Sequence, residues 1–375
     1  MEISAEDALR LNVLLANRPQ AVRIDEATMM VHGLFEQGEA RVSLNPTCRD
    51  EQYLRRVREL LSGHVTGSPG GYPVFLKRWT RMGQMREESL QQLLLLGEPE
   101  AVVAAVGSPG ITHELARRAW WAMQDAENAR CLLASRAVVE GDLGRELAQY
   151  LLDYLPFETE TDQMMESVRL VLQPGLINAS QRQTLWQRAA RKQAYLVGFL
   201  MALPDQLPDP IAAHPQLTEA QGRLGGLATQ GNPAANALLR VLDSPGQTFL
   251  RTVRIVLQRP PSQEVVNATL DLIRVYLSAL RSAGDPDQTL SELEDEAQDF
   301  YGPGGPARAC AEAAPDLLDM LIALRVLSGV GYGVLRPVLR DTTAIGSLMR
   351  RKLEPLMTPL MGHIVRLLGD GRTTH

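Results

Sequence analysis

Seven residues in the first quarter of the chain have the types that bind phosphate groups or stack on bases. They are six basic residues and one tryptophan: Arg55, Arg56, Arg58, Lys77, Arg78, Trp79 and Arg81. Basic side chains neutralise phosphates, and an aromatic ring adds a stacking surface, so the cluster is a candidate site for RNA, DNA or an acidic protein partner. The alternative interpretation is a solvated surface on which Trp79 packs against the rest of the protein.

A glycine-rich segment separates the two halves of this cluster. Residues 63–71 read GHVTGSPGG, and a flexible turn of this kind can cradle phosphate. Tyr72 and Pro73 follow, however, where a phosphate-binding loop carries Gly-Lys-Ser/Thr, and we expect no helix to start there. The segment therefore predicts a junction between two parts of the chain and excludes a nucleotide-binding loop.

Cys48 is the candidate reactive thiol. It follows Thr47 near the expected start of a helix and precedes Arg49, and a helix N-terminus or a nearby cation favours the thiolate. This setting suits a sulfur-carrying thiol; the alternative is a small buried hydrophobic residue. The three cysteines form no CxxC pair, so we expect no disulfide framework and a reducing cytoplasm.

Other types of site lack their motifs. No HExxH or Cys-Cys spacing is present that would hold zinc, and no serine stands in GxSxG. Gly329, Gly331 and Gly333 follow an apolar helical segment instead of a strand, which favours a loop between helices over a dinucleotide-binding turn. We therefore expect no catalytic residue, no cofactor and no metal.

Composition is typical of a folded protein. The chain has 375 residues, 45% of them hydrophobic and 22% charged. Its net charge of -6 argues against a protein that coats nucleic acid over its whole surface. The N-terminus carries Glu2, Glu6 and Asp7 where a signal peptide is positive. The most apolar window, residues 195–203, is about half the length of a membrane span, so we expect no span and a buried core helix there.

Periodicity divides the chain into three expected domains, residues 1–85, 86–205 and 206–375. The first is a small α+β domain with a helix over 5–16 and a short antiparallel meander of strands over 21–25, 29–35 and 40–45. Thr47 and Asp50 resemble a capping box, and the helix after them is expected to stop at Gly63. Residues 72–79, YPVFLKRW, are an edge-strand candidate or a lead into the next helix.

The rest of the chain is expected to be all-α. Gly110, Gly141 and Gly175 recur at separations of 31 and 34 residues, each between a short apolar helix and a longer one. This spacing predicts a helical-repeat-like body, either HEAT-like or an irregular α-solenoid. Four prolines between residues 204 and 215 predict a linker, and the acidic run over 291–305 predicts a solvated helix face followed by a loop.

Several segments resemble the DsrS family, sulfur reduction proteins found with the dissimilatory sulfite reductase genes of sulfur-oxidising bacteria. They include EDALRLNVLLANRPQAVRID, DEQYLRRVRELLSGHVTGSPGGYPVFLKRWTRMGQ, ELARRAWWAM and VRLVLQPGLI. The resemblance implies a soluble cytoplasmic accessory protein in the oxidation of stored sulfur. It brings no functional residues.

Three functional hypotheses follow. The first is a non-enzymatic accessory, interaction or regulatory protein whose partners belong to the sulfur-oxidation machinery. The second is a nucleic-acid-binding regulator that uses the basic residues between 55 and 86. The third is a thiol-dependent sulfur carrier that uses Cys48. A pocket of titratable groups would count against the first hypothesis, and absence of binding at low salt against the second.

Overall fold

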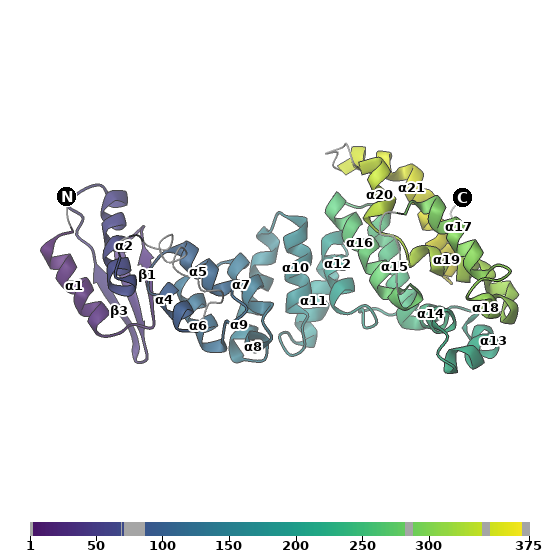
Figure 1. Ribbon diagram of the computed structural model, residues 1–375, viewed down its shortest axis with the longest axis horizontal. Coiled ribbons are helices and arrows are strands. Elements are labelled where there is room, and N and C mark those ends of the chain that lie inside the picture. The colour runs from purple at the N-terminus through teal and green to yellow at the C-terminus, as the bar shows by residue number, and fades with distance from the viewer. Residues whose placement is uncertain (1–2, 69, 71–86, 282–287, 340–345, 370–375) are drawn as a thin grey trace. The chain divides into compact units, whose positions relative to one another are not determined.

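The computed structural model describes residues 3–68, 70, 87–281, 288–339 and 346–369 (Figure 1). The chain forms two compact units. The first comprises residues 1–156 and 173–177, and the second comprises residues 157–172 and 178–375. The first unit thus contains the small domain expected over 1–85 together with the helices that follow it. Lys77, Arg78, Trp79 and Arg81, and with them the edge-strand candidate, lie outside the described residues.

The first unit begins with an α+β head, as the alternating pattern predicts. Its elements are α1 (Ala5–Ala16), β1 (Ala21–Asp25), β2 (Met30–Phe35), β3 (Gly38–Ser43) and α2 (Asp50–Thr66). The strands form an antiparallel sheet in the order β1-β2-β3, so the predicted meander is confirmed. Val31 pairs with Ile24 on one side and with Val42 on the other. These three side chains share the sheet face that α1 and α2 cover.

The head core holds a fully buried carboxylate. Asp7 accepts hydrogen bonds from the Asn45 backbone amide at 2.7 Å and from the Tyr53 hydroxyl at 2.5 Å, while Ser4 caps α1 by accepting from the Asp7 amide. Asp7 therefore ties α1 both to the segment after β3 and to α2. Sequence patterns do not identify this contact, because the partners lie 38 and 46 residues away.

Two details of α2 differ from the sequence prediction. The N-cap is Arg49, with no side-chain cap bond, so the capping box at Thr47 is wrong. The helix continues through Gly63 and ends at Gly67, whose φ of 68° is the left-handed conformation that glycine adopts readily. Leu61 is buried in the head core. In the turn that follows it, the Thr66 hydroxyl donates to the Ser62 carbonyl at 2.8 Å and the Ser62 hydroxyl donates to the Ser68 carbonyl at 2.7 Å.

The first unit continues with short helices of uneven length. They are α4 (Glu87–Leu93), α5 (Pro99–Val106), α6 (His113–Ala122), α7 (Ala126–Leu133), α8 (Arg136–Val139) and α9 (Asp142–Tyr154). Helices that are close in sequence pack together, notably α5 with its neighbour α6, and α7 with α9, the second helix after it. Gly110 and Gly141 lie between successive helices, as the repeat pattern predicts. A side chain at Gly141 would collide with His113, so the glycine there permits close packing.

The second unit is all-α. Its helices are α10 (Thr161–Val171), α11 (Ala179–Ala189), α12 (Gln193–Ala202), α13 (Leu217–Thr229), α14 (Pro233–Leu242), α15 (Ser244–Gln258), α16 (Gln263–Tyr276), α17 (Leu290–Tyr301), α18 (Arg308–Ala313), α19 (Leu318–Leu327), α20 (Tyr332–Leu339) and α21 (Gly346–Leu367). The expected core helix is confirmed as α12, which packs against α10, α15 and α16. The mainly α fold with a small N-terminal α+β domain is confirmed.

Among the described residues, no single helix has the length and apolar character needed to cross a membrane. The acidic run forms α17, with Leu293 and Ala297 buried and most of its carboxylates on the other side. Two of the carboxylates contact other helices. Glu294 lies 2.8 Å from His363 Nε2. Glu296 receives hydrogen bonds from Arg325 at 2.5 Å and from Arg281 at 2.8 Å, and both guanidinium groups are nearly buried. Burial opposes ionisation of Glu296, but these bonds outweigh it and lower the pKa of the carboxyl.

We predict acid sensitivity of the second unit from Glu296. Because its native pKa lies below the ordinary 4.5, ionised Glu296 stabilises the fold above that pH, and this contribution is lost as pH falls through the lowered value. Urea denaturation at pH 7 and near pH 3 should show a difference in unfolding free energy between wild type and Glu296→Gln that shrinks at the lower pH. A constant difference would contradict the assignment.

Candidate partner-binding groove

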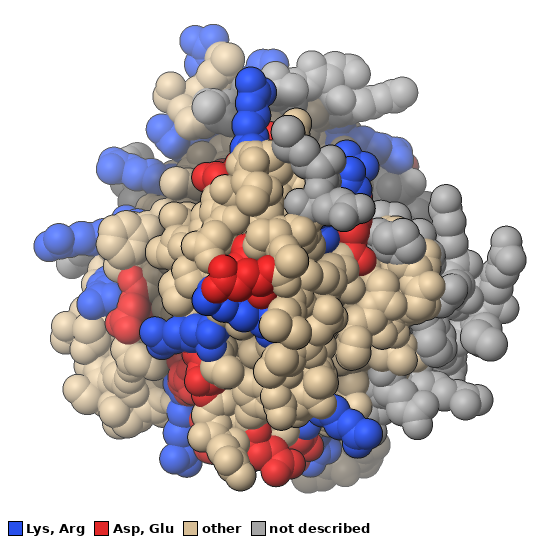
Figure 2. Space-filling model, turned by 90° about the vertical axis from the view of Figure 1, so that its left-hand side faces the viewer, with Lys and Arg blue, Asp and Glu red and all other residues tan. Residues whose placement is uncertain are grey.

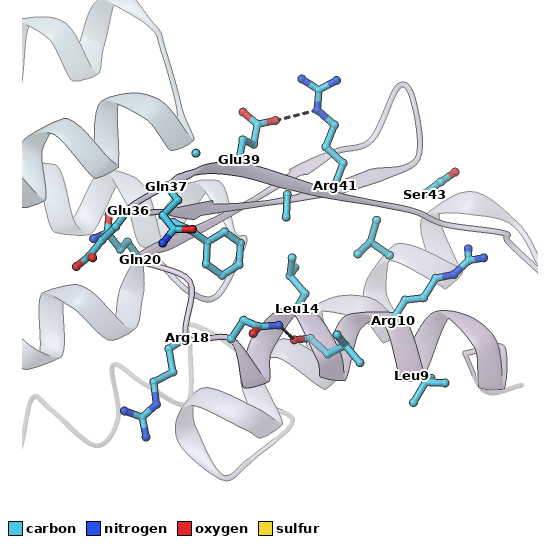
Figure 3. A pocket seen from close by; sticks show the side chains of 16 residues that line it. Leu9, Arg10, Leu14, Arg18, Gln20, Glu36, Gln37, Glu39, Arg41 and Ser43 are labelled. Atoms are coloured by element: carbon cyan, nitrogen blue, oxygen red, sulfur yellow. Dashed lines mark hydrogen bonds and ion pairs between the residues drawn. The ribbon is translucent and has the colours of Figure 1, made fainter.

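A groove of about 1000 Å³ separates α1 from β3 in the head (Figure 3). In Figure 3 Leu14 of α1 points toward β3, and Glu39 and Arg41 point to the side of the strand away from the helix. The lining comes from one side of α1, from Arg18 and Gln20 after it, and from residues 35–43. A Cβ at Gly33 would lie 3.0 Å from Leu14 Cδ1, so this glycine allows α1 to sit close to the sheet beside the groove.

The outer edge of β3 forms one wall of the groove. The Leu44 amide donates to the Met29 carbonyl, so by the alternation of an antiparallel ladder the peptide groups of Ala40 and Val42 face β2. Those of Glu39, Arg41 and Ser43 then point outward. In the described part of the chain, no hydrogen bond is made to this edge. The opposite edge differs, because on β1 the Val22 amide donates to the Leu94 carbonyl at 2.8 Å.

Two apolar side chains stand on the facing side of α1. Leu9 is 66% exposed and Val13 is 55% exposed, and both line the groove. They are four residues apart and therefore neighbours on the helix surface. Apolar side chains next to an unpaired strand edge form the kind of surface that binds an extended polypeptide.

Glu39 on β3 is held by several contacts on the sheet face away from α1. Its Oε1 lies 2.5 Å from His32 Nδ1 and accepts from Arg41 Nε at 3.2 Å, and its Oε2 accepts from Trp121 Nε1 at 3.3 Å. Burial opposes ionisation of the Glu39 carboxyl, but the hydrogen bonds have the larger effect, so that the pKa of Glu39 is lowered. Arg23 stacks over Trp121 with 4.8 Å to the ring centroid. An ionised carboxylate is thus fixed at the edge of the sheet, next to the Arg41 guanidinium.

The basic residues of α2 each have an acidic neighbour. Arg55 and Arg56 both pair with Glu59, at 3.4 and 2.6 Å, and Arg58 pairs with Glu26. On the end of the molecule drawn in Figure 2, blue and red side chains are intermixed over the described residues. Lys77, Arg78, Trp79 and Arg81 lie outside those residues, so nucleic-acid binding by the whole cluster stays a prediction.

Cys48 lies two residues before α2 and is partly buried against the head core. Its Sγ is 3.7 Å from the Arg49 carbonyl oxygen, and the first turn of α2 carries Asp50 and Glu51. The sulfur-carrier hypothesis relies on the positive N-terminal end of α2 to favour a thiolate at Cys48, and these carboxylates offset that positive charge. Burial raises the pKa of the other two thiols, Cys131 and Cys310.

The described residues contain no group of three or more His, Cys, Asp and Glu side chains arranged to hold a metal ion.

The sequence patterns did not predict the groove between α1 and β3. Its signal is the position of Leu9 and Val13, which are apolar but lie off the buried stripe of α1 formed by Leu11, Leu14 and Leu15. Apolar residues on both sides of a surface helix indicate a second contact surface.

Comparisons with protein-family models, with curated proteins and with solved structures found no match. The grounds for proposing a function are therefore the groove and the resemblance given above.

Proposed function

We propose that this chain is a non-enzymatic cytoplasmic accessory protein that acts by binding protein partners in the oxidation of stored sulfur. The observation that carries the binding role is the edge of β3, which receives no hydrogen bond from the described residues, beside the exposed Leu9 and Val13. The pathway and the compartment come from the resemblance to DsrS proteins.

The groove suits a bound strand. An extended segment can exchange main-chain hydrogen bonds with the outward peptide groups of Glu39, Arg41 and Ser43, and these bonds require no particular side chain. Every second side chain of the segment would then face α1, where Leu9 and Val13 offer apolar contact. Main-chain pairing supplies affinity, and the apolar contact selects the segment.

Capture from cells oxidising stored sulfur tests this role. Arg41→Pro removes an outward amide from the edge of β3 while leaving the ladder to β2 intact, since proline is tolerated on edge strands. We expect wild-type bait to retain protein partners, Arg41→Pro to lose them, and the control Arg41→Lys, which keeps both the amide and the positive charge, to retain them. Equal recovery with Arg41→Pro would contradict the groove as binding site. Loss of partners on nuclease treatment would favour the nucleic-acid hypothesis instead.

A further inference from the structure

We propose that the groove binds a second copy of this chain, with β3 pairing antiparallel to β3 of the copy so that the two three-stranded sheets become one. This inference rests on the proposed function in taking the groove as a protein-binding surface, and it names the partner. Three features support it: the register of the strand edge, the charges along that edge and the apolar side of α1.

The charge pattern of β3 selects a register. Only residues with outward peptide groups can form the hydrogen-bonded pairs across a new interface, and these are Glu39, Arg41 and Ser43. A two-fold axis through Ala40 places Glu39 opposite Arg41 of the copy, and the symmetry repeats this pair. Shifting the axis to Arg41 or to Glu39 places like charges opposite each other, which is unfavourable. An axis through Val42 pairs Arg41 with Ser43 and gains no ion pair, so the register centred on Ala40 is the one that places opposite charges together.

On the sheet face that α1 covers, the groove leaves space for the α1 helix of the copy. A two-fold axis perpendicular to the sheet keeps α1 and its copy on the same face, side by side across the axis. The β3 residues on that face near the axis are Gly38, Ala40 and Val42. Ala40 lies on the axis and Gly38 stands opposite Val42 of the copy, so a small residue is present in every pair and the copy can approach. Leu9 and Val13 then face their counterparts, so that two half-exposed apolar surfaces are buried together.

The arrangement is closed. In a two-fold interface the same patch is used by both copies, so the edge of β3 is consumed when two chains meet. The far edge of the sheet is occupied by the Leu94 carbonyl and does not extend the assembly by the same contact. A dimer is the expected end state, not a fibre.

The mass of the purified full-length chain in solution tests the inference. Sedimentation velocity and light scattering of wild type should give twice 41.3 kDa at micromolar concentration. Arg41→Glu places a glutamate opposite Glu39 in both symmetric pairs and should weaken the dimer about 100-fold. Leu9→Glu should also weaken it. The control Arg55→Glu makes the same charge change on an exposed residue of α2 and should leave the dimer unchanged.

A mixing experiment tests the register. Chains with Glu39→Arg and chains with Arg41→Glu each oppose like charges when they pair with themselves. In a mixed pair, both basic side chains of the first variant face acidic side chains of the second. The mixture should therefore form a heterodimer, and failure to do so would overturn the register centred on Ala40. Far-UV circular dichroism checks that both variants fold, and Leu9→Glu keeps the interface testable if Glu39→Arg does not.

The outcomes separate the inference from the proposed function. A wild-type chain that stays monomeric at the highest concentration at which it is soluble overturns the second copy as occupant, and capture of other proteins that still depends on Arg41→Pro keeps the proposed function. A dimer that is indifferent to both Arg41→Glu and Leu9→Glu also overturns the inference, because it forms elsewhere. If capture is then indifferent to Arg41→Pro as well, the proposed function falls with it.

Discussion

Replacing Gly246 with alanine is expected to lower the free energy of unfolding of the second unit by about 3 kcal/mol. Gly246 lies in the first turn of α15, where a Cβ would stand 2.3 Å from the Arg240 carbonyl oxygen and 2.5 Å from the Val241 Cα. Both are backbone atoms of α14, so no side chain can rotate away to relieve the overlap. The backbone of α14 or α15 must move, and both helices pack in the core of this unit.

Gly222→Ala is the matched control. Gly222 is an exposed residue inside α13 of the same unit, and a Cβ there meets nothing within 4 Å. Alanine has the higher helix propensity, so this change should stabilise the protein by about 0.5–1 kcal/mol. Urea denaturation followed by far-UV circular dichroism measures both variants. Equal urea midpoints for Gly246→Ala and wild type would show that the contact between α14 and α15 is looser than described.

Replacing Asp7 with alanine is expected to destabilise the head by about 3 kcal/mol. The substitution removes the acceptor of the Tyr53 hydroxyl and of the Asn45 amide, and it leaves the hydroxyl without this partner inside the core. Tyr53 is itself fully buried, so water cannot replace the carboxylate without opening the core. The tie from Asp7 to the segment after β3 is lost, and α1 keeps only the longer contacts of 3.2 Å between Ser4 and the Tyr53 hydroxyl of α2.

Two variants place this prediction in context. Glu6→Ala, one position earlier, removes only an exposed ion pair with Arg10 and should change stability by less than about 0.5 kcal/mol. Tyr53→Phe removes the hydroxyl donor and keeps the ring, so the loss of stability should be larger than for Glu6→Ala and smaller than for Asp7→Ala. Proteolysis of the first unit under native conditions, read by mass spectrometry, reports opening of the head. If Asp7→Ala is no more susceptible than Glu6→Ala, the carboxylate does not support the head.

Local pattern predicts most of the head, because strand alternation and the helical stripe of α1 are properties of neighbouring residues. The meander over residues 21–45 and the apolar helix α12 follow from such patterns. The end of α2 does not, because Gly63 and Gly67 look alike in sequence, and the hydrogen bonds of Ser62 and Thr66 that support the last turn are not visible in a local pattern.

The groove is harder to predict than the elements that form it. It depends on α1 and β3 lying next to each other, although more than 20 residues separate them in sequence. The predicted basic cluster is easy to find in the sequence by counting charges, but the count does not include the acidic partners. In the structure Arg55 and Arg56 pair with Glu59, one turn further along α2. Arg58 pairs with Glu26, which lies on a loop far away in sequence.

The position of the β3 edge near the N-terminus has a consequence for biosynthesis. Synthesis of the head is complete at about residue 68, when roughly 300 residues of this sequence still await translation. At about 5–20 residues per second, that interval lasts on the order of 15–60 s. Its contacts are local enough for the head to fold within that time. In the dimer inferred above, two nascent chains on one messenger RNA would present their β3 edges to each other before either helical body exists.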